Sequence, residues 1–340
     1  MKLKTLAIDL AKNTFCLVGF DRDNQPVWRK KQSRRQLEIF IAKQEPHLIA
    51  MEACASAHHW ARRFSQLGHQ VKLLPPQHVK AYLRGQKNDY NDAQAIGEAS
   101  LHGVTRSVPV KTVEQQDKQA FHRIRRQLMG EQTRIINQLR GLLGEYGIII
   151  DTGIHQANKA IPLILEDAEN GLTPKLRELV YRQYQRYLVL REELAWYEQQ
   201  LEQVAKTDPD VKRLQDVPGF GPVNANVLCS WLGDGTQFSR ARDASAALGV
   251  VPRQHTTGGH DRLFGITKRG DSYVRSMVVH GARAVVSRAK GKTDALSRWI
   301  NQLVARRGFN KAAIALTNKM IRIAWVLVTR GERYKPSLSM

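Results

Sequence analysis

Four acidic residues, Asp9, Glu52, Asp89 and Asp92, stand in sequence contexts that suit a metal site. Asp9 lies at the end of a short apolar run, and Glu52 lies near the end of a second run, LIAMEA. Asp89 and Asp92 are three residues apart in KNDYNDAQAI, at the expected start of a helix, so both carboxylates would share one helical face. Divalent cations such as Mg²⁺ prefer hard oxygen ligands, and two such ions can bracket a scissile phosphate. The pattern therefore predicts a site for Mg²⁺ or Mn²⁺ that supports phosphodiester chemistry.

Each of these acids also has an ordinary structural explanation. An aspartate at a helix start is most often an N-cap, and either Asp89 or Asp92 could be one. An acid at the end of a strand is often simply solvated. An acid within an apolar strand is costly, however, unless it is paired or bound to a metal. The occurrence of all four in one basic segment therefore favours the metal site.

A second group of reactive side chains lies in residues 250–284, which are rich in glycine, hydroxyl groups and positive charge. A Ser or Thr hydroxyl can attack a phosphodiester if a base or metal activates it and cations stabilise the developing charge. The cations available for this are Arg253, Arg262, Lys268, Arg269 and Arg275. The alternative is a flexible loop that grips phosphates without chemistry.

The sequence VPGFG at 217–221 has the form of a helix–hairpin–helix turn. Gly219 and Gly221 would let the backbone approach a phosphate and present N–H groups at a helix N-terminus. The alternative is a tight turn between two core helices. The strongly basic surroundings favour contact with a nucleic-acid backbone.

Positive charge is concentrated at the two ends of the chain. The 340 residues include 53 Lys and Arg against 31 Asp and Glu, a formal net charge of +22. Residues 1–108 hold 17 basic and nine acidic side chains, residues 109–208 hold 14 of each, and residues 209–340 hold 22 and eight. This surplus predicts a polyanionic partner, with nucleic acid as the leading candidate. The balanced middle is expected to be a solvated helical spacer or an oligomerisation element.

Composition argues against several classes of protein. With 42% hydrophobic and 25% charged residues, the chain is expected to be globular rather than disordered, with two or three domains. No run of about 18 apolar residues is present, so neither a spanning helix nor a membrane partner is expected. Asp9 and Lys12 interrupt the first apolar run, which excludes a signal-peptide shape. Three widely spaced cysteines indicate neither a disulfide framework nor a zinc site, which favours a reduced cytoplasmic compartment.

Hydrophobic spacing predicts an α/β domain with a mixed sheet in the first segment. The expected strands are Leu3–Leu10, Thr14–Phe20, Gln25–Arg29, Leu48–Ala53 and Val71–Leu74. The expected helices are Arg35–Lys43, Ala57–Leu67 and Asn91–His102.

The rest of the chain is predicted to be mainly helical. Two long helices, Val113–Tyr146 and Pro174–Val204, flank a break at Gly147–Pro162. Their irregular heptads suit an intermolecular coiled coil or an intramolecular helical hairpin about equally. The expected C-terminal elements are a hairpin over Leu214–Leu228, a glycine- and threonine-rich stretch at His255–Gly270, and helices at Asp271–Ala289, Ala295–Arg307 and Lys311–Thr329.

The motifs AIDLAKNTF, MEA at 51–53 and KNDYNDAQAI at 87–96 resemble the N-terminal domain of the IS110-family insertion-sequence transposases, with the closest fit to the IS1111 branch. The resemblance spans essentially the whole chain. It implies an RNase H-type, RuvC-like fold with a DEDD acidic tetrad that holds the metal. Carried over residue by residue, the tetrad is Asp9, Glu52, Asp89 and Asp92.

The same resemblance implies a domain organisation. Residues 1–150 would form the RuvC-like DEDD domain, with the long helix from about 113 attached. Residues 151–208 would form a helical or coiled-coil spacer that serves oligomerisation. Residues 209–340 would form a mainly α C-terminal transposase domain with a helix–hairpin–helix element.

The C-terminal domain of this family uses a serine just before a glycine as its nucleophile. Aligned on PRQH and TTGG, the matching position here is Thr257, with Thr256 as the fallback. Threonine has the same hydroxyl chemistry but a stiffer, more hindered Cβ. Either Thr257 serves as the nucleophile or the chain is impaired at this step. Ser272 and Ser276 fall on an expected helix and are weaker candidates.

The resemblance implies an RNA-guided DNA transposase or recombinase with a composite active site, the tetrad coming from one subunit and the nucleophile from another. Strand exchange would proceed through a covalent protein–DNA link. The implied partners are donor and target DNA, an element-encoded bridge or seeker RNA, and further copies of the chain in a dimer or tetramer. The implied location is the bacterial cytoplasm, in association with the nucleoid. The alternative function is a metal-dependent, structure-selective RuvC-type endonuclease without a covalent intermediate.

Overall fold

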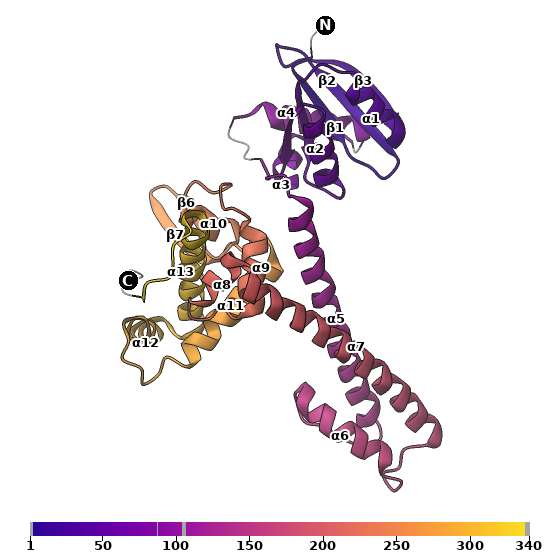
Figure 1. The fold of residues 1–340 in the computed structure, drawn as a ribbon, viewed down its shortest axis with the longest axis vertical. Helices are drawn as coiled ribbons and strands as arrows, with labels where there is room; N and C mark the ends of the chain where they lie inside the picture. Colours follow the sequence, from indigo (N-terminus) through magenta and orange to yellow (C-terminus); the bar gives the residue numbers. More distant parts are fainter. Residues whose placement is uncertain (1–2, 87, 104–106, 337–340) are drawn as a thin grey trace. The chain divides into compact units, whose positions relative to one another are not determined.

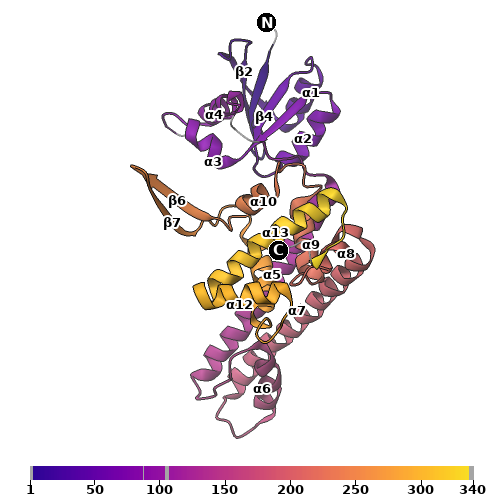
Figure 2. The same ribbon diagram turned by 90° about the vertical axis from the view of Figure 1, so that its left-hand side faces the viewer.

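A five-stranded sheet forms the centre of an N-terminal unit that comprises residues 1–116 (Figures 1 and 2). The computed structural model describes residues 3–86, 88–103 and 107–336. The strands are β1 (Thr5–Asp9), β2 (Thr14–Phe20), β3 (Pro26–Ser33), β4 (Leu48–Glu52) and β5 (Gln70–Leu74). Their order is β3-β2-β1-β4-β5, with β1, β2 and β3 antiparallel and β1, β4 and β5 parallel. The predicted mixed sheet is therefore confirmed.

Helices cover both faces of this sheet. They are α1 (Arg34–Ala42), α2 (Ala57–Gln66), α3 (Pro76–Val79), the 3₁₀ helix η1 (Lys80–Tyr82) and α4 (Asp89–Leu101). Leu6 and Ile8 of β1 pack in a core shared with α1 and α2, whereas Ala7 packs in the core beneath α4. Successive side chains on a strand point to opposite faces, so this alternation fixes which residues face α4.

The helix α4 lies close against the sheet because Gly97 has no side chain. A Cβ at this position would fall inside the van der Waals radius of the Phe20 ring on β2. Ala93, Ile96 and Ala99 complete the buried face of the helix. This close packing places the first turn of α4 beside the carboxyl ends of β1 and β4.

Three helices, α5 (Val113–Gly144), α6 (Ile154–Glu166) and α7 (Pro174–Thr207), share one elongated core. Figure 1 shows α5 and α7 crossing each other, with α6 near the lower end of α5. Arg125 on α5 also pairs with Glu198 on α7 at 3.0 Å. The long helices therefore pack within one chain, which is the intramolecular alternative drawn from the sequence. The break expected at Gly147–Pro162 is wrong in part, because buried Ala157 and Ile161 anchor α6 despite Pro162.

The C-terminal part of the second unit, which comprises residues 117–340, is a helical core with one hairpin. Its helices are α8 (Pro209–Gln215), α9 (Pro222–Leu232), α10 (Ala241–Ala247), α11 (Ser272–Ser287), α12 (Ala295–Arg307) and α13 (Phe309–Arg330). Its two strands are β6 (Pro252–Thr257) and β7 (His260–Ile266). The helices α10, α11 and α12 all pack against α13.

Among the described residues, α13 has the length and apolar composition of a membrane-spanning helix. This corrects the sequence-based expectation that no segment would qualify. Leu316, Met320 and Ala324 of the same helix are buried in the C-terminal core. A core helix of a globular unit has the same composition, so α13 is weak evidence for a membrane.

Candidate active site and nucleic-acid contacts

Asp9 and Glu52 project from the same edge and the same face of the sheet. β1 and β4 pair in parallel, and the two acids are the last residues of these strands. Ala7 and Ala50 pack on the α4 side of the sheet. Asp9 and Glu52 follow them by two residues, so their side chains face α4 as well.

The first turn of α4 brings two further carboxylates, Asp89 and Asp92, to this edge. The N-cap of the helix is Asn88, whose Oδ1 accepts a hydrogen bond from the Tyr90 N–H at 2.9 Å. Asn88 therefore fills the capping role that was the alternative explanation for the aspartates. The spacing of three residues leaves Asp89 and Asp92 on one helical face.

The structure brings three members of the predicted tetrad into one cluster. Asp9, Asp89 and Asp92 each offer a carboxylate oxygen, and these oxygens lie within 4.8 Å of one another. Glu52 is outside this group. Burial, and then the charge of Asp92, raise the pKa of the Glu52 carboxyl above its ordinary value. The donors are all hard oxygens, which fits Mg²⁺ or Mn²⁺ and does not fit a soft metal.

Lys31 is a neighbour of the cluster that sequence reasoning missed. It lies opposite Cys16 in the β2–β3 pair, and its Nζ is 4.0 Å from Oδ2 of Asp89. Burial raises the pKa of the Cys16 thiol, an effect opposed by Lys31 and reinforced by Asp89 and Asp9. The sequence predicts strands at Thr14–Phe20 and Gln25–Arg29. Extending the second strand by two residues and pairing it with the first would have placed Lys31 at this edge.

The stretch that carries the hydroxyl candidates is a β-hairpin, not the flexible loop that was the alternative expectation. Thr257 pairs with His260 across β6 and β7, which leaves Gly258 and Gly259 as the turn. Their φ angles are +57° and +79°. A two-residue turn with two positive φ values is type I′, which glycine adopts without steric cost.

The hydroxyl of Thr256 forms a hydrogen bond with a residue on the opposite strand. Its Oγ1 donates to Oδ1 of Asp261 at 2.6 Å, and Gln254 Nε2 donates to the same oxygen at 3.2 Å. Hydrogen bonds from Thr256 and then Gln254 lower the pKa of the exposed Asp261 carboxyl. Thr256 therefore acts as a hydrogen-bond donor within the hairpin.

The hydroxyl of Thr257 faces the other side of the hairpin. Its Oγ1 lies 3.4 Å from Nδ1 of His255. By strand register, His260 and Arg262 project on this face too. Thr257 thus has an imidazole as a neighbour and a guanidinium on the same face of the hairpin, a combination that suits proton removal and phosphate binding.

The five predicted phosphate-binding cations differ in availability. Four of them are exposed, namely Arg253, Arg262, Lys268 and Arg269. The guanidinium of Arg275 instead donates to the backbone carbonyls of Leu248 at 3.1 Å and Arg269 at 2.8 Å. Arg275 therefore holds the segment that precedes α11 in place.

The two glycines of the predicted helix–hairpin–helix turn have different surroundings between α8 and α9. Gly219 has a φ of +96°, and a Cβ there would lie 3.0 Å from the Gly281 carbonyl oxygen of α11. Close packing thus requires glycine at 219. Gly221 is exposed at the N-terminus of α9, where no side chain caps the helix and an added Cβ would meet nothing within 4 Å. Gly221 is the better placed of the two for a phosphate contact.

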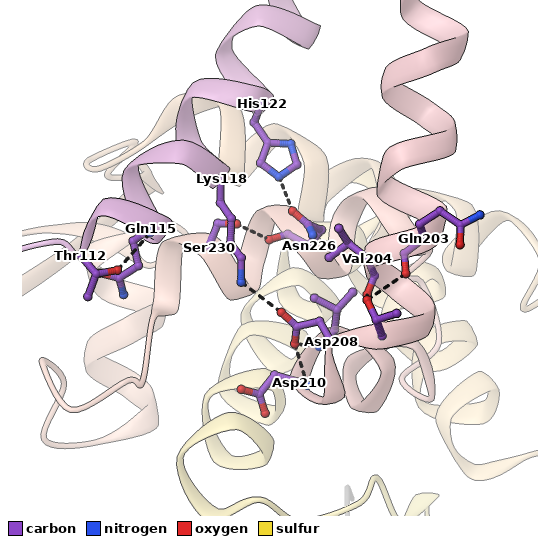
Figure 3. Close-up of polar contacts among 12 residues, drawn as sticks. Thr112, Gln115, Lys118, His122, Gln203, Val204, Asp208, Asp210, Asn226 and Ser230 are labelled. Carbon is purple, nitrogen blue, oxygen red and sulfur yellow. Dashed lines mark hydrogen bonds and ion pairs between the residues drawn. The ribbon is translucent and has the colours of Figure 1, made fainter.

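A polar network, not foreseen from the sequence, joins α5 to α8 and α9 (Figure 3). His122 Nε2 lies 2.6 Å from Asn226 Oδ1, and Lys118 Nζ donates to Asp208 at 3.1 Å. Burial alone would raise the pKa of the Asp208 carboxyl. Hydrogen bonds from the Val211 N–H and from Lys118 outweigh burial, so the pKa lies below its ordinary value.

Two family models match separate parts of the chain. A family model described as "Transposase IS116/IS110/IS902 family" matches residues 211–298, which include the hairpin and the cations. A second model, described as "Transposase" and representing the DEDD domain of IS110 proteins, matches residues 6–148, which include all four acids.

Full-length relatives extend the similarity over nearly the whole chain. The transposase for insertion sequence element IS1111A of Coxiella burnetii is 42% identical over 98% of this chain and 92% of its own length. A probable family 20 transposase of Pseudomonas aeruginosa is 42% identical over 99% of this chain and 100% of its own length. The transposase for IS1328 of Yersinia enterocolitica is 40% identical over 96% and 97%. The chain therefore belongs to the IS116/IS110/IS902 family and is an insertion-sequence transposase that catalyses DNA strand transfer.

Proposed function

We propose that this transposase is RNA-guided and exchanges DNA strands through a metal-bound acidic site and a covalent link from DNA to Thr257. The carboxylate cluster carries the proposal most strongly. Asp9, Asp89 and Asp92 converge within 4.8 Å, although they come from a strand and a helix far apart in the sequence. Carboxylates this close repel one another unless a cation lies among them.

Mg²⁺ or Mn²⁺ would be held by Asp9, Asp89 and Asp92, with Glu52 at the adjoining strand end. Such an ion supplies charge stabilisation to the attacking and leaving oxygens of a phosphodiester. The chain contributes the rigid placement of these ligands, since β1, β4 and α4 share one packed core. Lys31 adds a positive charge at the edge of the cluster, where a DNA phosphate could approach.

The proposed covalent step is a transesterification by the side chain of Thr257. Its Oγ1 forms a bond to phosphorus, and the bond from phosphorus to the leaving sugar oxygen breaks. The hydroxyl proton passes to Nδ1 of His255, and the leaving oxygen takes up a proton from solvent. The phosphodiester linkage is conserved as a phosphothreonine, so a hydroxyl from another DNA strand can attack it and release Thr257.

The cations of the hairpin serve phosphate binding in this scheme. Arg262 shares the face of Thr257, and Arg253, Lys268 and Arg269 are exposed nearby in the sequence. Gly221 offers the uncapped N-terminus of α9 to the DNA backbone, and Gly219 shapes the turn before it. Arg275 supports this surface by fixing the backbone at Leu248 and Arg269.

The active site is proposed to be composite between subunits. The acidic cluster and the hairpin belong to two separately packed units of the chain. Assembly of a dimer or tetramer would bring the cluster of one subunit to Thr257 of another. The charge-balanced helices α5 and α7 are the proposed oligomerisation element.

Guidance by an element-encoded bridge or seeker RNA accounts for the strong positive charge of a protein that has no obvious sequence-reading module. Base pairing of this RNA with donor and target DNA would then set specificity. We place the reaction in the bacterial cytoplasm, at the nucleoid. The test is to purify the transposase from cells that carry the whole element and to sequence the RNA that remains bound. Target choice that persists without any bound RNA would refute RNA guidance.

A second experiment separates strand exchange from simple cleavage. Purified transposase, the bound RNA and two labelled DNA duplexes are incubated with Mg²⁺, and joined strands are scored on denaturing gels. The proposal predicts recombinant strands that disappear in EDTA. Cleaved but never joined strands would support the alternative RuvC-type endonuclease.

A further inference from the structure

A cavity of about 120 Å³ lies in the C-terminal unit where α5, α9 and the start of α11 meet. The side chains that matter here are His122, Arg123 and Arg126 from α5, Trp231 from α9 and Tyr273 from α11. Neither the acidic cluster nor the β6–β7 hairpin contributes to its lining. The cavity is therefore separate from the groups proposed to carry out strand exchange.

His122 has a buried ring nitrogen without a hydrogen-bond partner among the residues that the structure describes. Its side chain points from α5 toward Asn226 on α9, as Figure 3 shows, and Nε2 lies 2.6 Å from Oδ1 of Asn226. Since that oxygen is an acceptor, Nε2 carries the proton. Burial lowers the pKa of His122, an effect that Asn226 opposes and Arg125 reinforces, and this favours the neutral ring. Nδ1 is then an acceptor, and it is buried without a hydrogen-bond partner.

Tyr273 supplies a second buried polar atom, its hydroxyl oxygen. Its hydroxyl is buried and has no hydrogen-bond partner in the described part of the chain, and its ring centroid lies 6.3 Å from that of His122. A buried polar atom without a partner is unfavourable, and the two residues that carry these atoms both line one cavity, which points to a ligand that satisfies both. The rest of the wall includes the apolar side chains of Val227 and Val274 and the indole of Trp231.

The mouth of the cavity is cationic. Arg123 and Arg126 are exposed, and within the described part of the chain neither forms an ion pair or hydrogen bond. The Arg126 guanidinium lies over the Tyr273 ring at 5.4 Å. The one acid at the rim, Asp271, is engaged as the N-cap of α11, where it accepts hydrogen bonds from two backbone N–H groups.

We propose that this cavity receives a single unstacked nucleobase of a bound nucleic-acid strand, with the adjoining phosphate on Arg123 and Arg126. A base N–H would donate to His122 Nδ1, and a base oxygen or ring nitrogen would accept from the Tyr273 hydroxyl. The flat ring would pack against Trp231 and the valines, as bases do on aromatic side chains. Ordered water could satisfy the two polar atoms but would use neither the apolar wall nor the arginines.

The inference rests on the nucleic-acid-binding part of the proposed function, so its test separates the two. Single-stranded RNA and single-stranded DNA of one sequence are prepared with an abasic site moved along the strand. Their affinities for the full-length transposase are measured by fluorescence anisotropy. We expect one abasic position to weaken binding about tenfold, the effect of losing one stacked base. The RNA and DNA series show which strand supplies that base.

Tyr273→Phe removes only the orphaned oxygen, so it should leave folding intact. It should weaken binding of the intact strand by the loss of one hydrogen bond, and so reduce the penalty at that abasic position, while leaving the affinity for the abasic strand unchanged. Arg126→Gln should weaken intact and abasic strands equally and reduce the salt dependence of binding. Matched controls are Tyr181→Phe and Arg182→Gln on α7, both exposed and outside the cavity.

Two results would overturn the inference. Equal affinities for all abasic positions, with Tyr273→Phe behaving as the parent, would mean that the cavity holds water only while the nucleic-acid-binding function stands. Failure of both RNA and DNA to bind at all would overturn that function together with the inference.

Discussion

The hydroxyl of Thr256 lies 2.6 Å from Oδ1 of Asp261 on the facing strand, and it is the donor in that hydrogen bond. This relationship distinguishes Thr256, the fallback candidate from the family resemblance, from Thr257, the matching position. Thr256 is tied to a carboxylate on one face of the hairpin, whereas Thr257 lies 3.4 Å from His255 on the other. This difference favours Thr257 over Thr256 as the proposed nucleophile.

Thr256→Val should leave the proposed covalent protein–DNA adduct within about threefold of the parent level. The substitution keeps the β-branched shape and removes only the hydroxyl that donates to Asp261. Adduct formation is measured with end-labelled DNA on denaturing gels. Loss of the adduct in Thr256→Val, together with an unchanged melting temperature, would mean that the roles of the two threonines are reversed.

Asp92→Asn should abolish the thermal stabilisation that Mg²⁺ confers on the protein. The charge of Asp92 raises the pKa of Glu52, so removing that charge relieves repulsion, and the melting temperature in EDTA should not fall. The proposed metal site exists only in the folded protein, so Mg²⁺ should raise the melting temperature of the parent. Strand cleavage should drop at least about 100-fold in the variant.

The matched control for this variant is Asp23→Asn, which removes an exposed acid from a turn of the same unit. Its response to Mg²⁺ should equal that of the parent. A melting temperature that rises equally with Mg²⁺ in Asp92→Asn and in the parent would remove Asp92 from the metal site.

Gly97→Ala should destabilise the transposase by about 1–3 kcal/mol, the usual cost of overpacking a core. The new methyl group would overlap the Phe20 ring and push α4 away from the sheet. Gly130→Ala on α5 is the control, since its Cβ would meet nothing within 4 Å and alanine favours a helix by about 0.5–1 kcal/mol. Urea unfolding measures both variants. An unchanged free energy of unfolding in Gly97→Ala would mean that the space between α4 and the Phe20 ring can hold a methyl group.

His58 should make the stability of the transposase depend on pH. Burial, with the charges of Lys111 and Arg62, lowers the pKa of His58 to about 4, and Nδ1 accepts from the Lys111 N–H at 3.2 Å. An unfolded histidine titrates near about 6.5. Between these pH values the unfolded chain binds a proton that the folded chain excludes. The contribution of His58 to the free energy of unfolding is therefore complete above about pH 6.5 and declines as the pH falls toward 4.

The measurement is the melting temperature from pH 4 to 8 for the parent, His58→Gln and the exposed neighbour control His59→Gln. Glutamine at 58 can still accept from the Lys111 N–H but does not titrate. The decline below pH 6.5 should be shallower in His58→Gln and unchanged in His59→Gln. Identical curves for all three proteins would contradict the assignment.

Hydrophobic patterning was sufficient to predict the sheet and most of the acidic cluster. Buried strands with β-branched and aromatic residues gave the order of elements, and Asp9 and Glu52 were correctly placed at strand ends. The spacing of Asp89 and Asp92 correctly gave one helical face. What the spacing could not give was the position of Lys31, because that depends on the register of β2 against β3.

The β6–β7 hairpin was not predicted because its residues lie almost entirely in solvent. Strand prediction relies on alternation between buried and exposed residues, and β6 has no buried residue. The one local signal was Gly258–Gly259, a pair typical of a type I′ turn. The contrast between Thr256 and Thr257 then follows from strand register, which no local pattern contains.

The cavity beside His122 and the start of α6 escaped prediction for a related reason. Both depend on tertiary packing, in which α9 and α11 close over α5 and in which Ile161 anchors a helix that contains Pro162. A histidine within a long polar helix carries no signal of its partner 104 residues away. Local spacing therefore predicts the helices and strands, whereas the partners in the polar network can be identified only from the three-dimensional structure.

The central claim is that Thr257 becomes covalently attached to DNA. The most direct measurement is mass spectrometry of the peptide that spans 253–262 after transposase, RNA, Mg²⁺ and cleavable DNA are mixed, denatured and digested with nuclease and protease. We expect a nucleotide on Thr257, its loss in Thr257→Ala and in Asp9→Asn, and its retention on the residue at position 257 in Thr257→Ser. A nucleotide attached to another residue, or strand exchange that proceeds in Thr257→Ala, would contradict it.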